Sequence, residues 1–407
     1  MRRFFFGLFC VLCAAAVIGA FLFFRPFSEH SPQEVIRMVD APDRRLPYRM
    51  MEKIYPAKDL GRAERVTTFP RDLRDLDISY EWDGATRNLE DYVERRNVQG
   101  ILVLKDGQVV LEEYFGDAEK GSGFTSWSVA KSVVASLIGI ALEEGEIESL
   151  DDKVSAYDAS YVGTDYGDTT IRHLLMMSSG IDFDENYEAE GSDILKLFFN
   201  TFLLNKDVDN VLRPYERNRE PGQDFDYISS NTQVLGAVLR GAYGTDLASL
   251  FREKIGEPIG ISGGTWLTDR QGSAGKVLAY CCMQLTLENY AKLGQLYVQD
   301  GVVGETRVLP EGWRDFVRTP PTTSHEPKRE GSLGYGHHFW LTGGDEGAFA
   351  MHGYDGQYVH MDPEEGVVIV MTSADRSAFN RSPEFAKLFR AIKDELKPGG
   401  TAGRASQ

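Results

Sequence analysis

The stretch TSWSVAKSVVASLIGIALEEG, residues 125–145, predicts the helix around which the rest of the chain is organised. Its apolar side chains recur at helical spacing, and the polar groups of its first turn and a half are serines and one lysine. Gly145 follows the apolar run at a position that commonly ends a helix. We therefore expect a buried helix, whose lysine needs a partner or a chemical role.

Ser128 and Lys131 lie three positions apart in this stretch, so a helix places them on one face. An ammonium beside a hydroxyl in apolar surroundings is costly unless it is paired or loses its proton. A desolvated lysine can help to deprotonate serine, which is the chemistry of the S-x-x-K motif. The alternative is structural, with Ser128 as an N-cap and Lys131 reaching the solvent.

The same spacing occurs a second time, at Ser273 and Lys276. A four-residue motif of common residues arises by chance in a chain of this length. The second copy lies in a glycine-rich stretch without the apolar periodicity that would bury its lysine. We therefore expect a solvated loop there.

Composition excludes several classes of function. A chain of 407 residues with 42% hydrophobic residues can bury a large core, and its net charge of −18 argues against nucleic-acid binding. Cys10 and Cys13 lie in an N-terminal apolar run, while Cys281 and Cys282 are adjacent, and neither spacing predicts a disulfide framework or a zinc site. The seven histidines form no ligand cluster, so we expect no metal and no cofactor.

An uncharged apolar run covers residues 4–24, after Arg2 and Arg3. It is about as long as the roughly 20 residues that a helix needs to cross a bilayer. The apolar part of a secretory signal is usually only about 7–15 residues long and ends in small residues, whereas this run ends in Phe24 and Arg25. We expect a membrane anchor in residues 1–25, with the catalytic part in the periplasm or exterior. The alternative is a cleaved signal and a secreted protein.

Three further segments follow the N-terminal one. Residues 26–84 are rich in proline and charge without clear periodicity, which predicts a linker. Residues 85–397 carry the periodic patterns of a folded domain. Residues 398–407 have the glycine, alanine and serine content of a disordered tail.

The domain is expected to be α+β. Strands are predicted at 99–105 and 108–114, joined by Asp106-Gly107, which is a strong hairpin signal. Strands return at 349–353, 356–361 and 366–371, before an amphipathic helix at about 383–396. This order predicts one antiparallel sheet built from both ends of the chain, flanked by helices, with an inserted helical region.

Three motifs now stand in one order: Ser128 with Lys131, then Tyr227-Ile228-Ser229, then Met351-His352-Gly353. This order resembles the serine β-lactamase and penicillin-binding-protein superfamily, and specifically its class C-like branch of esterases, D-amino peptidases and 6-aminohexanoate-dimer hydrolases. The resemblance extends from about Leu89 to Leu396. It implies a β-lactamase/transpeptidase-like fold.

The resemblance also implies catalytic roles. Ser128 matches the acylated nucleophile, Lys131 the lysine that receives its proton, and Tyr227 the phenol that acts as general base and later protonates the leaving group. The lysine and the tyrosine are expected to titrate as a pair, because a neighbouring ammonium favours the ionised phenol. The oxyanion hole would map onto the backbone N–H groups of Ser128 and Tyr354.

Two departures from the family pattern concern substrate binding. Ser229 stands where lactamases have an asparagine, so one contact to a substrate amide is shortened or lost. If Gly353 takes the glycine place of the third motif, Met351 fills the place of a cationic residue. A register shifted by one would put His352 there instead.

The first functional hypothesis is a serine hydrolase that cleaves a small-molecule amide or ester through an acyl-enzyme. The alternatives are a penicillin-recognising D,D-peptidase or β-lactamase, and a catalytically silent binding domain on the same scaffold. An acidic run follows Gly180 and consists of Asp182, Asp184, Glu185, Glu188 and Glu190. One interpretation is that it lines the mouth of the site, but a solvated acidic loop is favoured.

Overall fold

The computed structural model describes residues 2–24, 37, 41, 43–345, 347–375 and 384–397. The predicted tail at 398–407 and most of residues 25–42 lie outside the described residues.

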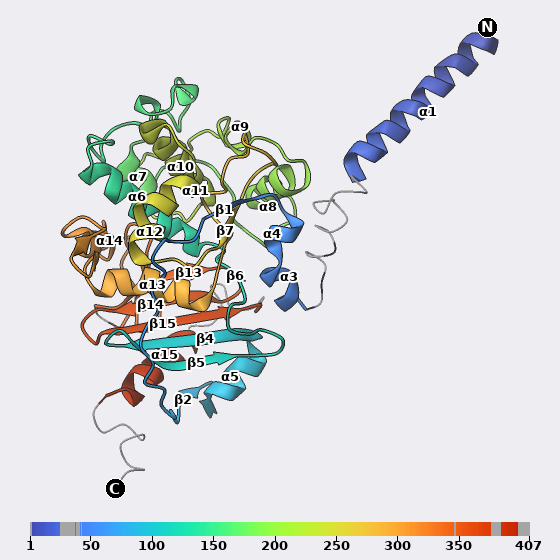
Figure 1. Cartoon of the computed structure of the whole chain (residues 1–407). Coiled ribbons are helices and arrows are strands. Elements are labelled where there is room, and N and C mark those ends of the chain that lie inside the picture. The colour runs from blue at the N-terminus through green and yellow to red at the C-terminus, as the bar shows by residue number, and fades with distance from the viewer. Residues whose placement is uncertain are drawn as a thin grey trace.

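A seven-stranded antiparallel sheet forms the centre of the domain, in the order β11-β12-β13-β14-β15-β4-β5 (Figure 1). The pairing of β15 with β4 joins the last strand of the chain to an early one, which confirms the predicted sheet built from both ends. The strands are β4 (Val98–Lys105), β5 (Gln108–Tyr114), β11 (Leu333–Tyr335), β12 (Trp340–Thr342), β13 (Phe349–Gly353), β14 (Gln357–Asp362) and β15 (Val367–Ser373).

Local sequence explains the middle of this sheet. β15 is buried along its whole length and β4 along all but its last residue, as expected for strands rich in Val, Leu and Ile that are covered on both faces. Asp106 and Gly107 have φ values of 51° and 75°, and these positive angles suit a tight two-residue hairpin between β4 and β5. The predicted hairpin is therefore confirmed.

Helices cover both faces of the sheet. α5 (Leu89–Arg95) and α15 (Glu384–Glu395) pack on one face, where Leu388 and Ile392 are fully buried with Ile101 and Ile369 of the sheet. On the other face lie α13 (Leu287–Val298), which packs against β14, β15 and β4, and α6 (Val129–Glu143), which packs against β13 and β14.

In Figure 1 the inserted helical region gathers around α6, above the central sheet. α6 is buried without interruption from Val129 to Ala141, and Gly145 has a φ of 76°, so the predicted buried helix is confirmed. α10 (Ser229–Tyr243) packs against it. The remaining helices are α7 (Ile171–Leu175), α8 (Asp193–Phe198), α9 (Val208–Leu212), α11 (Leu247–Phe251), α12 (Glu257–Ile259) and α14 (Trp313–Val317), with short 3₁₀ turns at Val154–Ala156 and Ala159–Tyr161 and π turns at Phe199–Leu203 and Arg252–Gly256.

Residues 43–84 belong to the domain and are not a linker, which corrects the predicted boundary. Tyr48, Met51 and Tyr55 are almost fully buried in the main core. This segment also supplies β1 to a second sheet, of order β1-β7-β8-β6. Its elements are α3 (Arg45–Arg49), α4 (Met51–Ile54), β1 (Ala57–Asp59) and the pair β2 (Ser79–Trp82) and β3 (Ala85–Asn88), and the other strands of the second sheet are β6 (Phe124–Thr125), β7 (Thr265–Leu267) and β8 (Met283–Leu285).

The N-terminal apolar run forms α1 (Arg2–Phe24), whose side chains are described, and exposed, from residue 5 to residue 21. Over the described residues, the structure contains no helix that is long and apolar enough to cross a membrane. The predicted anchor at residues 1–25 stays a prediction.

Candidate active site

Ser128 occupies the N-cap position of α6 without capping the helix. Its φ of −71° and ψ of −3° are helical, and its side chain makes no capping hydrogen bond. Its hydroxyl instead accepts a hydrogen bond from Lys131 Nζ at 2.9 Å, and the lysine is only 1% exposed. The alternative in which Ser128 caps the helix and Lys131 reaches the solvent is therefore wrong.

The chain turns sharply just before Ser128. Ser126 N donates to Met283 O at 2.7 Å, at the end of the β6–β8 pairing, and the next residue, Trp127, has a φ of 41°. A positive φ is strained for a bulky side chain, and such residues cluster at functional sites. This turn delivers the Ser128 hydroxyl to the edge of a cavity.

Lys131 donates hydrogen bonds to three acceptors: Ser128 Oγ at 2.9 Å, Ser229 Oγ at 3.0 Å and Tyr280 O at 2.9 Å. Burial lowers the pKa of its ammonium to about 7, and the charge of Glu185 opposes this shift. Near neutral pH a substantial fraction of Lys131 is therefore unprotonated and able to accept the proton of the Ser128 hydroxyl.

Tyr227 lies over the same lysine, with Lys131 Nζ 5.1 Å from its ring centroid. Burial raises the pKa of the Tyr227 hydroxyl well above its usual range, and a hydrogen bond with Ser128 only partly offsets this effect. Burial therefore keeps the phenol protonated in this site, and the paired titration of Lys131 and Tyr227 stays a prediction. A neutral Tyr227 can still carry a proton between Ser128 and a leaving group.

Ser229 connects the lysine to a carboxylate. It is the first residue of α10, and its Oγ, which accepts from Lys131, donates to Glu185 Oε1 at 2.5 Å. Ser229 N donates to Glu185 Oε2 at 2.9 Å. The acidic run is exposed at Asp182, Asp184 and Glu188, as expected for a solvated loop, but Glu185 turns inward. No pattern in the sequence separates it from its neighbours.

The cavity beside Ser128 has a volume of about 220 Å³ and is mainly aromatic. Its wall consists of Arg44, Tyr48, Trp127, Ser128, Tyr187, Leu195, Phe198, Ser229, Tyr280, Cys281 and Tyr354. Arg44 and Tyr48 come from the segment that had been predicted to be a linker. No motif in the sequence marks these two residues, because their segment joins the site only through tertiary packing.

Tyr354 lies in the turn between β13 and β14 and faces the same cavity as Ser128. Its ring stacks on Tyr187 with the centroids 4.8 Å apart. A Cβ on the preceding Gly353 would lie 2.2 Å from Ser126 O, so glycine alone allows β13 to approach the turn before Ser128 this closely. This close approach fits the glycine place of the third motif. The oxyanion role of the Tyr354 N–H stays a prediction.

Met351 and His352 are not among the described side chains that line the cavity. Met351 is 1% exposed within the main core. His352 stacks on Trp340 at 5.8 Å and meets Phe385 of α15 at 5.1 Å, on the opposite face of the sheet. Burial lowers its pKa to about 3, which keeps the ring neutral. The predicted substrate contacts of these two residues have no support from this arrangement.

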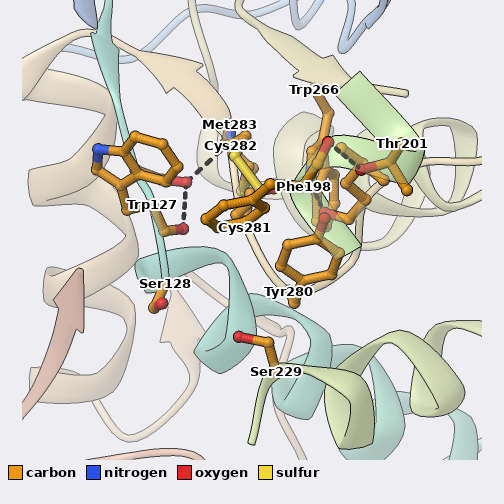
Figure 2. The surroundings of a disulfide bond; sticks show 12 residues. Trp127, Ser128, Phe198, Thr201, Ser229, Trp266, Tyr280, Cys281, Cys282 and Met283 are labelled. Atoms are coloured by element: carbon orange, nitrogen blue, oxygen red, sulfur yellow. Dashed lines mark hydrogen bonds between the residues drawn. A yellow bond between two sulfur atoms is a disulfide. The ribbon is translucent and has the colours of Figure 1, made fainter. Parts of the chain in front are cut away.

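Cys281 and Cys282 form a disulfide, which corrects the expectation from their spacing (Figure 2). The bonded pair lies between Trp127 and Tyr280, and Cys281 lines the cavity. Cys282 N donates to Trp127 O at 3.3 Å, and Trp266 Nε1 donates to Cys281 O at 2.8 Å. The disulfide therefore belongs to the segment that holds the Tyr280 carbonyl against the catalytic lysine candidate.

The second S-x-x-K copy has no such surroundings. Ser273 is exposed in a turn, and Lys276 Nζ binds Asp207 at 3.0 Å and Asp209 at 2.6 Å. Among the residues that the structure describes, Ser273 therefore has no lysine partner, as the sequence indicated.

Comparison with known proteins agrees with this geometry. The sequence profile of the β-lactamase family matches residues 85–391. The chain belongs to the β-lactamase family. A relative in this family, the 6-aminohexanoate-dimer hydrolase of Paenarthrobacter ureafaciens, is 24% identical over 351 residues, which cover 82% of this chain and 86% of the relative.

Solved structures with the same fold include a Bacillus anthracis protein provisionally named a 6-aminohexanoate-dimer hydrolase. Its TM-score is 0.77 at 22% identity, over 88% of this chain and 96% of that protein. EstCE1, described as a hydrolase with promiscuous acyltransferase activity, has a TM-score of 0.60 at 18% identity, over 75% of this chain and 96% of its own. The predicted fold and the predicted class of β-lactamase-like serine hydrolase are confirmed.

Proposed function

We propose that this chain cleaves a small amide or ester through an acyl-enzyme on Ser128, with Lys131 and Tyr227 as the proton-transferring groups. The observation that carries the proposal is the buried hydrogen bond between Lys131 Nζ and Ser128 Oγ. Because burial lowers the pKa of Lys131 to about 7, a much larger fraction of it is unprotonated near neutral pH, and so able to accept the serine proton, than of a lysine in water.

The reaction divides into two halves. In the first, Ser128 Oγ bonds to the substrate carbonyl carbon while its proton passes to Lys131, and the backbone N–H groups of Ser128 and Tyr354 stabilise the oxyanion. The bond to the leaving amine or alcohol then breaks, and Tyr227 passes the proton to that group. In the second half, a water molecule bonds to the acyl carbon and gives its proton to the same groups. The bond to Ser128 Oγ then breaks, Ser128 regains its proton, and the carboxylic acid is released.

The substrate is proposed to be a linear amide or ester, as the name of the Paenarthrobacter relative suggests. The cavity supports this choice because aromatic walls suit an extended acyl chain. The alternative is a penicillin-recognising enzyme. It is supported by Arg44, which lines the cavity and whose guanidinium, although 3.5 Å from Asp355 Oδ2, is a group that binds carboxylates. Comparing second-order rate constants for p-nitrophenyl butyrate, a 6-aminohexanoate dimer and a chromogenic cephalosporin separates the two. Cephalosporin turnover at the ester rate or above would favour the alternative.

The acyl-enzyme itself is tested with a pair of matched variants. Ser128→Ala should abolish ester hydrolysis, while Ser273→Ala, in the exposed second motif, should leave kcat/KM within about twofold. Equal losses in both variants would overturn the assignment of the nucleophile.

The localisation is part of the same proposal. We propose attachment to a membrane through residues 1–25, with the catalytic domain in the periplasm or exterior. Arg2 and Arg3 before an apolar run support this orientation. The disulfide also supports an oxidising compartment. Fractionation of the full chain tests the proposal, and a soluble mature chain that starts near Arg25 would indicate a cleaved signal instead.

A further inference from the structure

A continuous chain of hydrogen bonds leaves the nucleophile on its buried side. Ser128 Oγ accepts from Lys131, Lys131 donates to Ser229 Oγ, and Ser229 Oγ donates to Glu185 Oε1. The other carboxylate oxygen of Glu185 accepts from Ser229 N. Both carboxylate oxygens of Glu185 therefore accept hydrogen bonds from Ser229, the residue that contacts Lys131.

Few charged groups surround this series of hydrogen bonds. Lys131 is surrounded by the phenols of Tyr227 and Tyr280 and by His338, whose pKa burial lowers to about 3, so the histidine is neutral. Among the described residues, Glu185 is the carboxylate whose charge acts on Lys131. The groups that face Glu185 are Lys131 and the phenols of Tyr166, Tyr187, Tyr227, Tyr280 and Tyr335, which burial keeps protonated.

This arrangement matters most when Lys131 carries a proton. The transfer from Ser128 creates an ammonium in a site where an unpaired charge is expensive. The negative charge of Glu185 stabilises that ammonium, and in turn the charge of Lys131 opposes the rise that burial causes in the pKa of Glu185. The Ser229 hydroxyl bonds to both side chains and holds them in place. Tyr187, whose hydroxyl donates to Glu185 Oε1 at 2.6 Å, holds the carboxylate in turn.

We propose that Glu185 is a positioning residue, which holds Lys131 against Ser128 through Ser229 and whose negative charge sets the pH range in which Lys131 accepts a proton. The proposal rests on the proposed acyl-enzyme at Ser128. Glu185 itself forms no covalent bond and does not contact the substrate.

A purely structural role would look different. Ser229 is the first residue of α10, and a carboxylate there also satisfies a backbone N–H and complements the helix dipole. Such a role would stabilise the fold without affecting the titration of Lys131. The pH dependence of the rate therefore separates the two explanations.

The experiment compares Glu185→Gln with the wild type, using kcat and kcat/KM for p-nitrophenyl butyrate from pH 5 to pH 9. The negative charge of Glu185 raises the pKa of Lys131, so its removal should lower that pKa. Because unprotonated Lys131 is the active form, the acidic limb of the pH–rate profile should move to lower pH, by about one unit. The plateau kcat should fall about tenfold, since glutamine cannot accept from both Ser229 donors. The exposed Glu190→Gln is the matched control and should retain the wild-type profile.

Ser229→Ala provides a second readout if the glutamine variant does not fold. It removes the Oγ bridge but keeps the Ser229 N–H bond to Glu185, so kcat should fall about tenfold while the acidic limb stays within a few tenths of a unit. An unchanged limb in Glu185→Gln, or an unchanged kcat in Ser229→Ala, overturns the role of Glu185. A wild type that neither hydrolyses the ester nor reacts with a fluorophosphonate at Ser128 would instead overturn the proposed function.

Discussion

Replacing Tyr227 with phenylalanine removes one hydroxyl from the centre of the site and little else. The ring packs on Trp340 with the centroids 5.2 Å apart and meets Tyr335 edge-on at 5.9 Å, and phenylalanine keeps both contacts. The lost hydrogen bond with Ser128 is worth about 0.5–1.5 kcal/mol of net stability, so the variant should fold and melt within a few degrees of the wild type.

The effect on rate should be much larger. General acid–base catalysis is worth about 10²–10⁴-fold, or roughly 3–5 kcal/mol in the activation free energy, and Tyr227 is the group placed to carry the proton to the leaving group. The assay is kcat for a linear amide and for p-nitrophenyl butyrate. The amide should lose more, because an amine leaving group needs a proton and p-nitrophenolate does not. A loss below tenfold on the amide, in a variant that melts normally, would refute this role and leave Lys131 as the base.

Three further outcomes follow from the same geometry. The wild-type kcat/KM should fall tenfold per unit as the pH drops below about 7, because protonated Lys131 cannot accept a proton, and a pH–rate profile that is flat down to pH 5 would contradict this. Gly353→Ala should lower the free energy of unfolding by about 1–3 kcal/mol and remove most of the activity, because its methyl group would lie 2.2 Å from Ser126 O. Chemical denaturation measures the free energy of unfolding, and a value equal to that of the wild type would contradict the close approach. Replacing Cys281 and Cys282 together by alanine should lower kcat about tenfold by loosening the Tyr280 carbonyl on Lys131, and unchanged kinetics would show that the disulfide has no part in positioning the lysine.

Local patterns in the sequence were enough for the parts of the fold that depend on local physics. The apolar period at 125–145 predicted α6, and the positive φ angles that Asp106-Gly107 tolerates predicted the hairpin. The S-x-x-K spacing predicted the contact of Ser128 with Lys131, because a helix fixes which residues share a face.

The features that were missed depend on contacts between distant segments. Glu185 is one acid in a run of acids, and only the position of α10 shows that it turns toward Ser229. The elements of residues 43–84 are three to five residues long, too short for a periodic signal. The side chain of Met351 was expected at the substrate, but strand alternation and the packing of α6 on β13 bury it in the core.

The central claim is that Ser128 becomes acylated during turnover. The most direct test is to mix the wild type with excess p-nitrophenyl butyrate, quench it in acid within the first turnovers and identify the modified peptide by mass spectrometry. The account predicts a butyryl group on Ser128, absent from Ser128→Ala and more persistent in Tyr227→Phe. A butyryl group on another residue, or rapid ester hydrolysis by Ser128→Ala, would contradict it.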